Sequence, residues 1–202
     1  MMRLYISGNS PYARKTRIVA RETGLISQIE EITVTSLEDL QEAGPGEKIP
    51  VLICEDGARL CESMIINGYL NELAHGQLLP KNPSQLRNCL EIESVGSVLM
   101  DSIFARSLEN NQRKEHERSQ TILKREQRRT QRCLDRLDQL SIDFEESVTL
   151  ASVAVVSALG YANWRAPEDN WADGREDLEN YFNHFMRRPA FAETAPVIKS
   201  TT

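Results

Sequence analysis

The sequence predicts a two-part protein, an α/β domain followed by an all-helical domain. Strand-like apolar runs separated by turn residues are found early in the 202-residue chain. Two closely spaced prolines, Pro80 and Pro83, interrupt this pattern and mark residues 79–84 as a linker. Beyond them, apolar residues recur three and four positions apart, which is the spacing of helices. We therefore expect an α/β domain in residues 1–78 and a helical domain in residues 85–202.

The composition is that of an ordinary globular protein with a moderate negative charge. The formal net charge is -6 at pH 7, and 40% of the residues are hydrophobic. No apolar run approaches the ~20 residues that a membrane-spanning helix needs. Ser7, Gly8 and Asn9 end the first apolar run before it could serve as a signal peptide. We therefore expect a cytoplasmic protein with no membrane partner.

The first strand leads directly into a helix. Residues 3–6 alternate polar and apolar side chains as a strand does, and turn residues follow. Ser10 then suits the N-cap, because its hydroxyl can accept from free backbone N–H groups, and Pro11 suits the first helical position. Gly24 is a natural stop for this helix. A serine at such a place is most often only a cap, but its hydroxyl also lies where an anion is stabilised.

A second strand and a short acidic helix come next. Residues 29–35 form a β-rich run, and residues 36–46 read as a short acidic helix with a loop. Pro50 stands directly before the apolar run of residues 51–54. A proline cannot donate to a sheet ladder, so this position predicts the first residue of a strand.

A hairpin and a helix complete the first domain. Residues 56–57 (Asp-Gly) form the turn, residues 58–61 return as a strand, and Glu62 and Ser63 open a helix. The apolar positions of that helix are Ile65, Ile66, Tyr69, Leu70 and Leu73. The order strand, helix, strand, helix, hairpin, helix (βαβαββα) is the thioredoxin-like order.

The second part is expected to consist of long helices joined by short connections. Leu90 and Val98 belong to the apolar stripe of the first helix, and the helix that Thr149 caps is apolar on nearly every side, so it must be buried. The expected helices are 84–111, 113–140, one from Thr149, and 175–187, with an irregular segment at 164–174 and an aperiodic tail at 194–202.

The second of these helices carries a basic run. Its cations are Arg113, Lys114, Arg118, Lys124, Arg125, Arg128, Arg129, Arg132 and Arg136. Clustered cations can exchange counterions with nucleic acid phosphates. Glu115, Glu117, Glu126 and Asp135 are interleaved with them, and the whole chain is acidic, which indicates a solvated face with i,i+4 ion pairs. We therefore expect no nucleic acid partner.

The four cysteines are scattered and form no metal-ligand pattern. Cys54 and Cys61 lie on successive strands of one hairpin, so a disulfide between them is conceivable. In a reducing compartment, cysteines instead behave as small apolar residues. We expect the latter for these two and for Cys89 and Cys133, with no metal site and no catalytic cysteine.

Several segments together resemble bacterial cytosolic glutathione transferases. Residues 10–13 (Ser-Pro-Tyr-Ala) look like the Cys-Pro-Tyr-Cys of glutaredoxins with both cysteines replaced. Residues 49–51 (Ile-Pro-Val) look like the proline loop of the same fold, and residues 56–63 look like the hairpin and helix start that bind the γ-glutamyl group. Residues 149–161 and 188–191 support the resemblance, which covers essentially the whole chain. It implies the GST fold, a thioredoxin-like N-terminal domain followed by an all-α helical bundle.

The resemblance implies a site for glutathione as a co-substrate. Ser63, at a helix start, suits the γ-glutamyl carboxylate, and Glu62 suits the ammonium group. Val51 would offer a strand edge to the cysteinyl backbone if the Ile49–Pro50 bond is cis, as in the family. Lys48 either meets the glycine carboxylate or is a solvated lysine.

The same resemblance implies activation of the glutathione thiol. Ser10 would donate a hydrogen bond to the sulfur and lower the thiol pKa from about 8.5 toward neutrality. The thiolate would then attack an electrophilic carbon of a hydrophobic co-substrate. Asn9 and Tyr5 are alternative donors. A serine in place of the glutaredoxin cysteine argues against thiol–disulfide exchange through a protein cysteine.

The sequence says less about the electrophilic co-substrate and about partner proteins than about the glutathione site. Met100, Phe104 and Trp164 are expected between the domains, where they either line the electrophile site or belong to the core. The family resemblance implies a homodimer. The alternative function is a non-catalytic binding or regulatory module of the same fold that recognises a protein or a nucleic acid.

Overall fold

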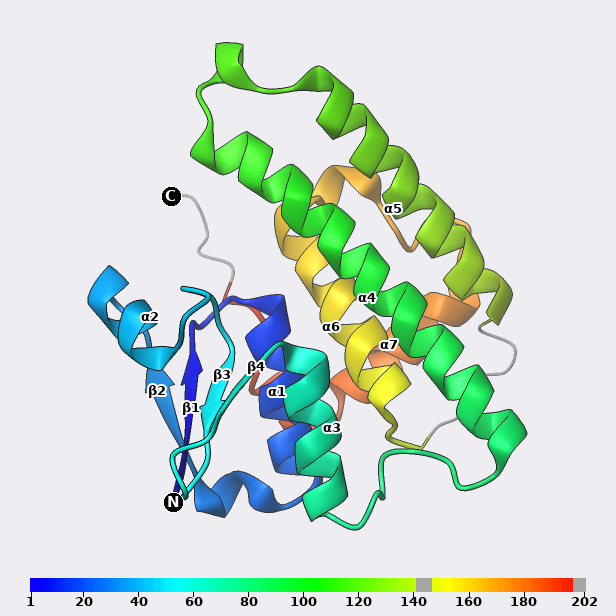
Figure 1. Cartoon of the computed structure of the whole chain (residues 1–202). Coiled ribbons are helices and arrows are strands. Elements are labelled where there is room, and N and C mark those ends of the chain that lie inside the picture. The colour runs from blue at the N-terminus through cyan, green and yellow to red at the C-terminus, as the bar shows by residue number, and fades with distance from the viewer. Residues whose placement is uncertain (141–146, 198–202) are drawn as a thin grey trace.

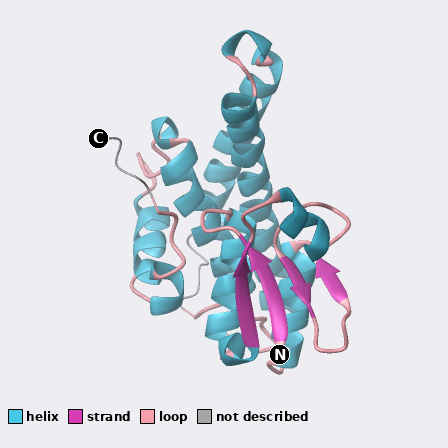
Figure 2. Ribbon diagram, turned by 90° about the vertical axis from the view of Figure 1, so that its left-hand side faces the viewer, coloured by secondary structure: helices cyan, strands magenta, loops and turns pink. Residues whose placement is uncertain are grey.

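A four-stranded sheet organises the first part of the chain (Figure 1), in a computed structural model that describes residues 1–140 and 147–197. Its strand order is β2-β1-β3-β4. β1 (Met2–Ile6) pairs in parallel with β2 (Ile29–Thr33) and antiparallel with β3 (Val51–Ile53), and β3 pairs antiparallel with β4 (Arg59–Cys61). Figure 2 shows these strands as one layer beside a mostly helical body. The predicted thioredoxin-like sheet is confirmed.

Both faces of the sheet are covered. Because strand side chains alternate, Leu4 and Ile6 join Ile66 in one core, whereas Tyr5 packs with Ala43 on the opposite face. The covering helices are α1 (Pro11–Glu22) and α3 (Ser63–Leu73) on the first face and α2 (Leu37–Ala43) on the second, with a short 3-10 turn, η1 (Leu25–Gln28), after α1.

The first helix begins where the sequence places it. Ser10 is the N-cap, its Oγ accepts from the backbone N–H of Ala13 at 3.2 Å, and Pro11 is the first helical residue. The helix ends at Glu22, and Gly24 adopts the left-handed φ of 73° that a glycine allows.

Helices make up the rest of the described chain. They are α4 (Pro83–Gln112), α5 (Gln120–Leu140), α6 (Leu150–Arg165), α7 (Glu176–Met186) and α8 (Pro189–Ala192), with the 3-10 turns η2 (Glu115–Glu117) and η4 (Pro167–Asp169). α6 is buried along its whole length up to Ala162, as predicted, and a reciprocal capping box between Thr149 and Ser152 starts it. None of the described helices is both long and apolar enough to cross a bilayer.

Three sequence predictions about this part are wrong. The helix expected from residue 113 begins only at Gln120, because Ser119 accepts from the N–H of Ile122 and is itself fixed by the carboxylate of Glu109. Trp164 lies inside α6 rather than in an irregular segment. Leu90 and Val98, expected on an inward stripe, are 46% and 44% exposed.

The two parts of the chain share one core. Leu4 and Ile66 of the first part contact the same buried cluster as Val153 and Phe191 of the second. The predicted boundaries at residues 78 and 85 therefore separate segments of the chain rather than two independent cores, and the domain assignment stays a prediction.

A buried arginine connects the two parts of the chain within this shared core. Arg14 of α1 is 2% exposed and donates to the backbone oxygens of Val156 at 3.3 Å and Phe191 at 3.1 Å. Burial lowers the pKa of Arg14 to about 10, so the group remains charged at neutral pH. Gly160 makes room for it, since a Cβ there would lie 2.2 Å from Nη1 of Arg14.

Candidate functional site

A cavity of about 690 Å³ opens where the two parts of the chain meet. The start of α1 and the start of α3 form one wall, and α4 and the end of α6 form the other. The predicted site residues that line it are Asn9, Ser10, Lys48, Ile49, Pro50, Glu62 and Ser63. The structure thus brings together residues that are far apart in the sequence.

Ser10 lies half-buried at the cavity wall. Its Oγ accepts the capping bond from Ala13, and a hydroxyl that accepts can still donate its own hydrogen. The free N–H groups of the first turn of α1 make the surrounding potential positive. A sulfur atom placed beside Ser10 would therefore meet both a donor and a favourable field.

The two alternative donors are placed less well. Both ends of the Asn9 amide are engaged by Val197, with Nδ2 donating to its carbonyl at 3.1 Å and Oδ1 accepting from its N–H at 3.0 Å. Tyr5 is 4% exposed and packs with Ala43 and Val51 on the far face of the sheet, outside the cavity lining. The tail thus contacts the candidate site at Val197, and the last five predicted tail residues, 198–202, lie outside the described residues.

The start of α3 carries the second pair of predicted residues. Ser63 is the first helical residue and is 4% exposed, and Glu62 precedes it with a left-handed φ of 67°. Such a backbone costs a non-glycine residue on the order of 1 kcal/mol. This conformation puts Glu62 in the cavity lining directly before the free N–H groups of the helix.

The strand edge predicted at Val51 is wrong. Val51 is 2% exposed and sits inside the sheet, with Tyr5 and Cys61 as its neighbours on either side. The Ile49–Pro50 bond is cis, and Ile49, which precedes the ladder, lines the cavity. The backbone at Ile49 is therefore the place where an extended peptide could pair.

The side of the cavity that faces α4 and α6 contains residues that were not expected from the sequence. Tyr12 donates its hydroxyl to Asp101 of α4 at 2.7 Å and packs edge-on against Phe104, with ring centroids 5.5 Å apart. Burial, and then the bond to Asp101, raises the pKa of Tyr12. Tyr12 stands between Pro11 and Ala13 in the motif that predicted the site, but its partner on α4 depends on the tertiary fold.

Only two of the three residues proposed for the electrophile site lie there. Phe104 and Trp164 line the cavity, together with Tyr161 and Arg165 of α6. Met100 is fully buried in the helical core, which is the second of the two places that the sequence allowed for it.

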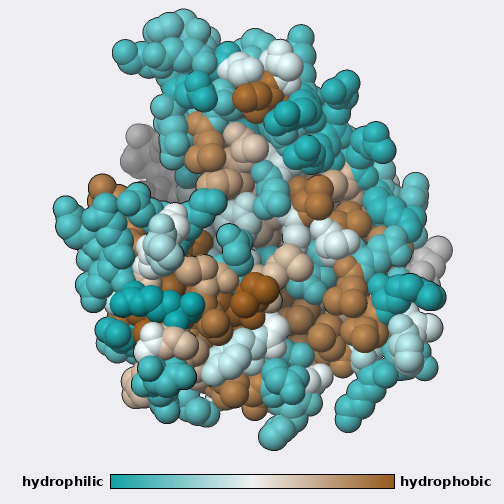
Figure 3. Space-filling view, in the orientation of Figure 1, coloured by the Kyte–Doolittle hydropathy of each residue, from teal (hydrophilic) through white to brown (hydrophobic). Residues whose placement is uncertain are grey.

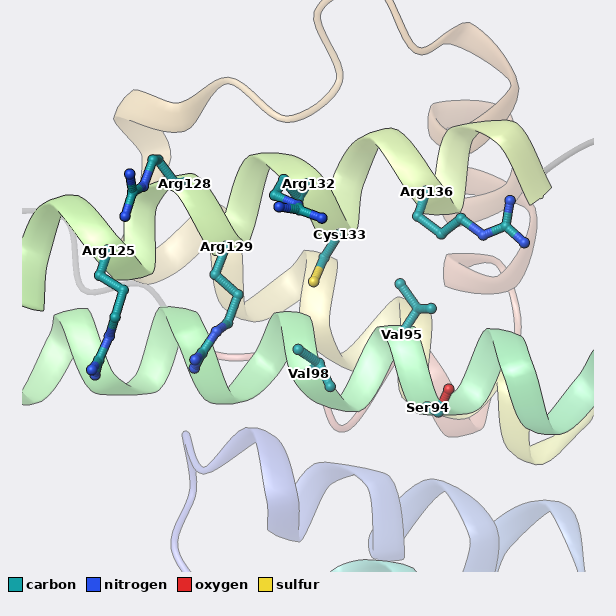
Figure 4. Close-up of a pocket in the computed structure, with 9 residues that line it drawn as sticks. All are labelled: Ser94, Val95, Val98, Arg125, Arg128, Arg129, Arg132, Cys133 and Arg136. Atoms are coloured by element: carbon teal, nitrogen blue, oxygen red, sulfur yellow. The ribbon is translucent and has the colours of Figure 1, made fainter.

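A second cavity, of about 640 Å³, lies between α4 and α5 (Figure 4). It is lined by Ser94, Val95, Val98, Cys133 and five arginines, Arg125, Arg128, Arg129, Arg132 and Arg136. Glu126 pairs with Arg125 and Arg129, and Glu91 pairs with Arg136. Ion pairs are therefore present, but these three do not have the predicted i,i+4 spacing, and the basic run also lines a groove.

The remaining chemistry predictions concern thiols and metals. None of Cys54, Cys61, Cys89 and Cys133 is in a disulfide, so the conceivable bridge between Cys54 and Cys61 is not formed. Within residues 1–140 and 147–197, no three His, Cys, Asp or Glu side chains gather as a metal site would require.

Comparison with known proteins identifies the family. Residues 9–73 match the family model for the glutathione S-transferase N-terminal domain. A glutathione S-transferase from Methylobacillus flagellatus, solved with glutathione bound, is 31% identical, has a TM-score of 0.85, and aligns over 98% of this chain and 100% of its own.

Two further relatives also align over nearly their full length. A glutathione S-transferase from Methylobacterium radiotolerans, in complex with glutathione sulfonate, is 29% identical with a TM-score of 0.89 over 100% of this chain and 97% of its own. An uncharacterized GST-like protein of Escherichia coli, YibF, is 28% identical over 96% of this chain and 98% of its own. The chain belongs to the glutathione S-transferase family.

Proposed function

We propose that this protein is a glutathione transferase, which binds reduced glutathione in the 690 Å³ cavity and joins its sulfur to a hydrophobic electrophile. One observation carries the proposal. Ser10, Glu62 and Ser63 line the same cavity although they begin two different helices. The relatives from Methylobacillus and Methylobacterium, which hold glutathione or its sulfonate, support the choice of ligand.

Each part of glutathione has a matching group. The γ-glutamyl carboxylate would accept from Ser63 and the free N–H groups at the start of α3, and the ammonium would pair with Glu62. The cysteinyl backbone would pair with the backbone at Ile49. Lys48, an exposed residue of the cavity rim, would meet the glycine carboxylate.

The chemical step follows from the position of Ser10. Its hydroxyl donates to the sulfur and stabilises thiolate over thiol, and each unit of lowered thiol pKa corresponds to about 1.4 kcal/mol. The thiol proton passes to solvent. The thiolate electron pair then forms a carbon–sulfur bond, and the leaving group departs with the electron pair of the bond that breaks. Ser10 itself is not modified.

Titration calorimetry with reduced glutathione tests the binding site. We expect saturable binding to the wild type and binding about tenfold weaker or more in Glu62→Ala and Ser63→Ala, because each change removes a charge-assisted contact. Glu72→Ala is the control, since Glu72 lies exposed on the same helix outside the cavity lining. Absence of binding to the folded wild type would refute the proposal.

We propose in addition that the protein is a homodimer and acts in the cytoplasm, where a reducing environment would keep its four cysteines out of disulfides. A set of large apolar side chains is exposed on α3 and α4, namely Met64, Ile65, Tyr69, Leu73, Leu90 and Val98. Figure 3 shows hydrophobic residues at the surface of the molecular face on which α3 and α4 lie. Large apolar side chains exposed together on one face of a molecule are typical of an interface.

The arginine-lined groove favours a second candidate function, binding of an acidic protein or a nucleic acid without catalysis. The groove presents Arg128 and Arg132 beside the paired arginines of α5 (Figure 4). Ser10→Ala separates the two functions. A transferase loses turnover in this variant, whereas a binding module shows no turnover in either form and keeps its partner.

A further inference from the structure

The electrophile side of the cavity has an aromatic wall and one cation. Flat rings line it from both parts of the chain, Tyr12 of α1, Phe104 of α4, and Tyr161 and Trp164 of α6. Arg165, the last residue of α6, lies over the Trp164 ring, with its guanidinium carbon 3.6 Å from the ring centroid. A guanidinium over a ring face keeps its N–H edges available for a ligand that lies in the plane of the guanidinium.

The charge of Arg165 has no protein counterion among the described residues. No carboxylate there lies within 4 Å of its nitrogens, and its Nε is buried without a hydrogen-bond partner. The phenol of Tyr161 interacts with it but is neutral at pH 7, because burial raises its pKa further.

Three acidic residues close to Arg165 in the sequence or in the cavity lining have other partners. Glu168 and Asp169, which follow Arg165 closely in the chain, both pair with Arg106. Asp101, on the same side of the cavity, accepts the hydroxyl of Tyr12. A half-buried cation with no carboxylate of its own favours an anionic ligand.

We infer that the co-substrate is a planar, aromatic electrophile with a carboxylate, which stacks among the rings and pairs with Arg165. The inference rests on the proposed function, because glutathione fills the other half of the cavity. It narrows the expected substrates from hydrophobic electrophiles in general to aromatic acids.

Binding of glutathione conjugates tests this inference without requiring turnover. The probes are S-benzylglutathione and S-(carboxybenzyl)glutathione with the carboxylate at the meta or the para position. We expect calorimetry on the wild type to show at least one carboxylated isomer binding about tenfold tighter or more than the benzyl conjugate. Arg165→Gln should abolish this preference and leave the affinity for S-benzylglutathione nearly unchanged, and Arg165→Lys should retain part of it.

Arg187→Gln is the matched control, because Arg187 is an exposed arginine outside the cavity lining. This variant should prefer the carboxylated conjugate over S-benzylglutathione by the same factor as the wild type. The inference is overturned if the wild type binds glutathione but neither carboxylated isomer more tightly than the benzyl conjugate. It is also overturned if Arg165→Gln lowers the affinity for all conjugates equally. Arg165 would then only hold the aromatic side chains of the cavity in place. If glutathione itself does not bind, the proposed function fails and this inference fails with it.

Discussion

At the scale of single residues, some residues of the site could be predicted from the sequence and others could not. Ser10, Glu62 and Ser63 stand at helix starts, and helix starts follow local rules of capping and turn residues. Asp101 lies in the middle of α4 and Arg165 is the last residue of α6, and no local signal in the sequence marks either residue. They enter the site only because the tertiary fold places α4 and α6 opposite the starts of α1 and α3 across the cavity.

Ser10→Ala tests the role of the hydroxyl. Since Ser10 lowers the pKa of the bound thiol in our proposal, the variant should hold less thiolate at pH 7, and kcat should fall about 10- to 100-fold with a loss of 1.4 to 2.8 kcal/mol. Above the pKa of the unassisted thiol, about 8.5, both proteins hold thiolate and the difference should shrink. Measurements of kcat against pH for both proteins check this difference. Calorimetry gives the affinity of each protein for glutathione.

The control for this prediction is Ser84→Ala, which removes a hydroxyl from the exposed first turn of α4. Its pH profile should match that of the wild type. An unchanged profile in Ser10→Ala would show that Ser10 is only a helix cap and would direct attention to Asn9.

At the scale of elements, the starts of α1 and α6 were predicted from their caps, whereas the start of α5 was placed too early. The hydroxyl oxygens of Ser10 and Thr149 accept from backbone N–H groups three residues later, and both starts were found in the sequence. Ser119 caps α5 in the same local way, by accepting from the N–H of Ile122, and the carboxylate of Glu109, ten residues earlier on α4, accepts from the N–H of Ser119. The charged residues between them carry no local stop signal, so the sequence analysis extended the helix too far.

The contact between α1 and α6 gives a stability prediction. Gly160→Ala places a methyl group where Arg14 lies, and Arg14 cannot move without losing its bonds to Val156 and Phe191. We expect a loss of about 1–3 kcal/mol in the free energy of unfolding, measured by chemical denaturation.

Gly68→Ala is the matched control, a glycine in the middle of α3 with nothing within 4 Å of its Cβ position. It should raise the stability by about 0.5–1 kcal/mol, because alanine is the better helix former. If Gly160→Ala were as stable as the wild type, the hydrogen bonds of Arg14 between the two parts would not contribute to stability as we describe.

At the scale of the whole molecule, hydrophobic patterning predicted the buried helix α6 but not which apolar side chains remain exposed. Periodicity identifies an apolar face and does not say whether the same chain or another one covers it. Ile65, Tyr69 and Leu73 of α3 fit a helical stripe in the sequence, yet the structure leaves them at the surface. This excess of exposed apolar residues is the physical reason to expect a second copy.

Ile65→Lys tests the homodimer at its most exposed apolar position on α3, where the side chain is 60% accessible in the single chain. A two-fold interface contains each substitution twice, so the loss of two buried isoleucines, about 1.5–3 kcal/mol each, should raise the dimer dissociation constant roughly 100-fold or more. Sedimentation velocity over a concentration series should show the wild type as a dimer and Ile65→Lys shifted to monomer. Leu37→Lys, on the exposed side of α2, should leave the dimer intact. A wild type that stays monomeric would remove the homodimer from the proposal, and a dimeric Ile65→Lys would place the interface away from α3.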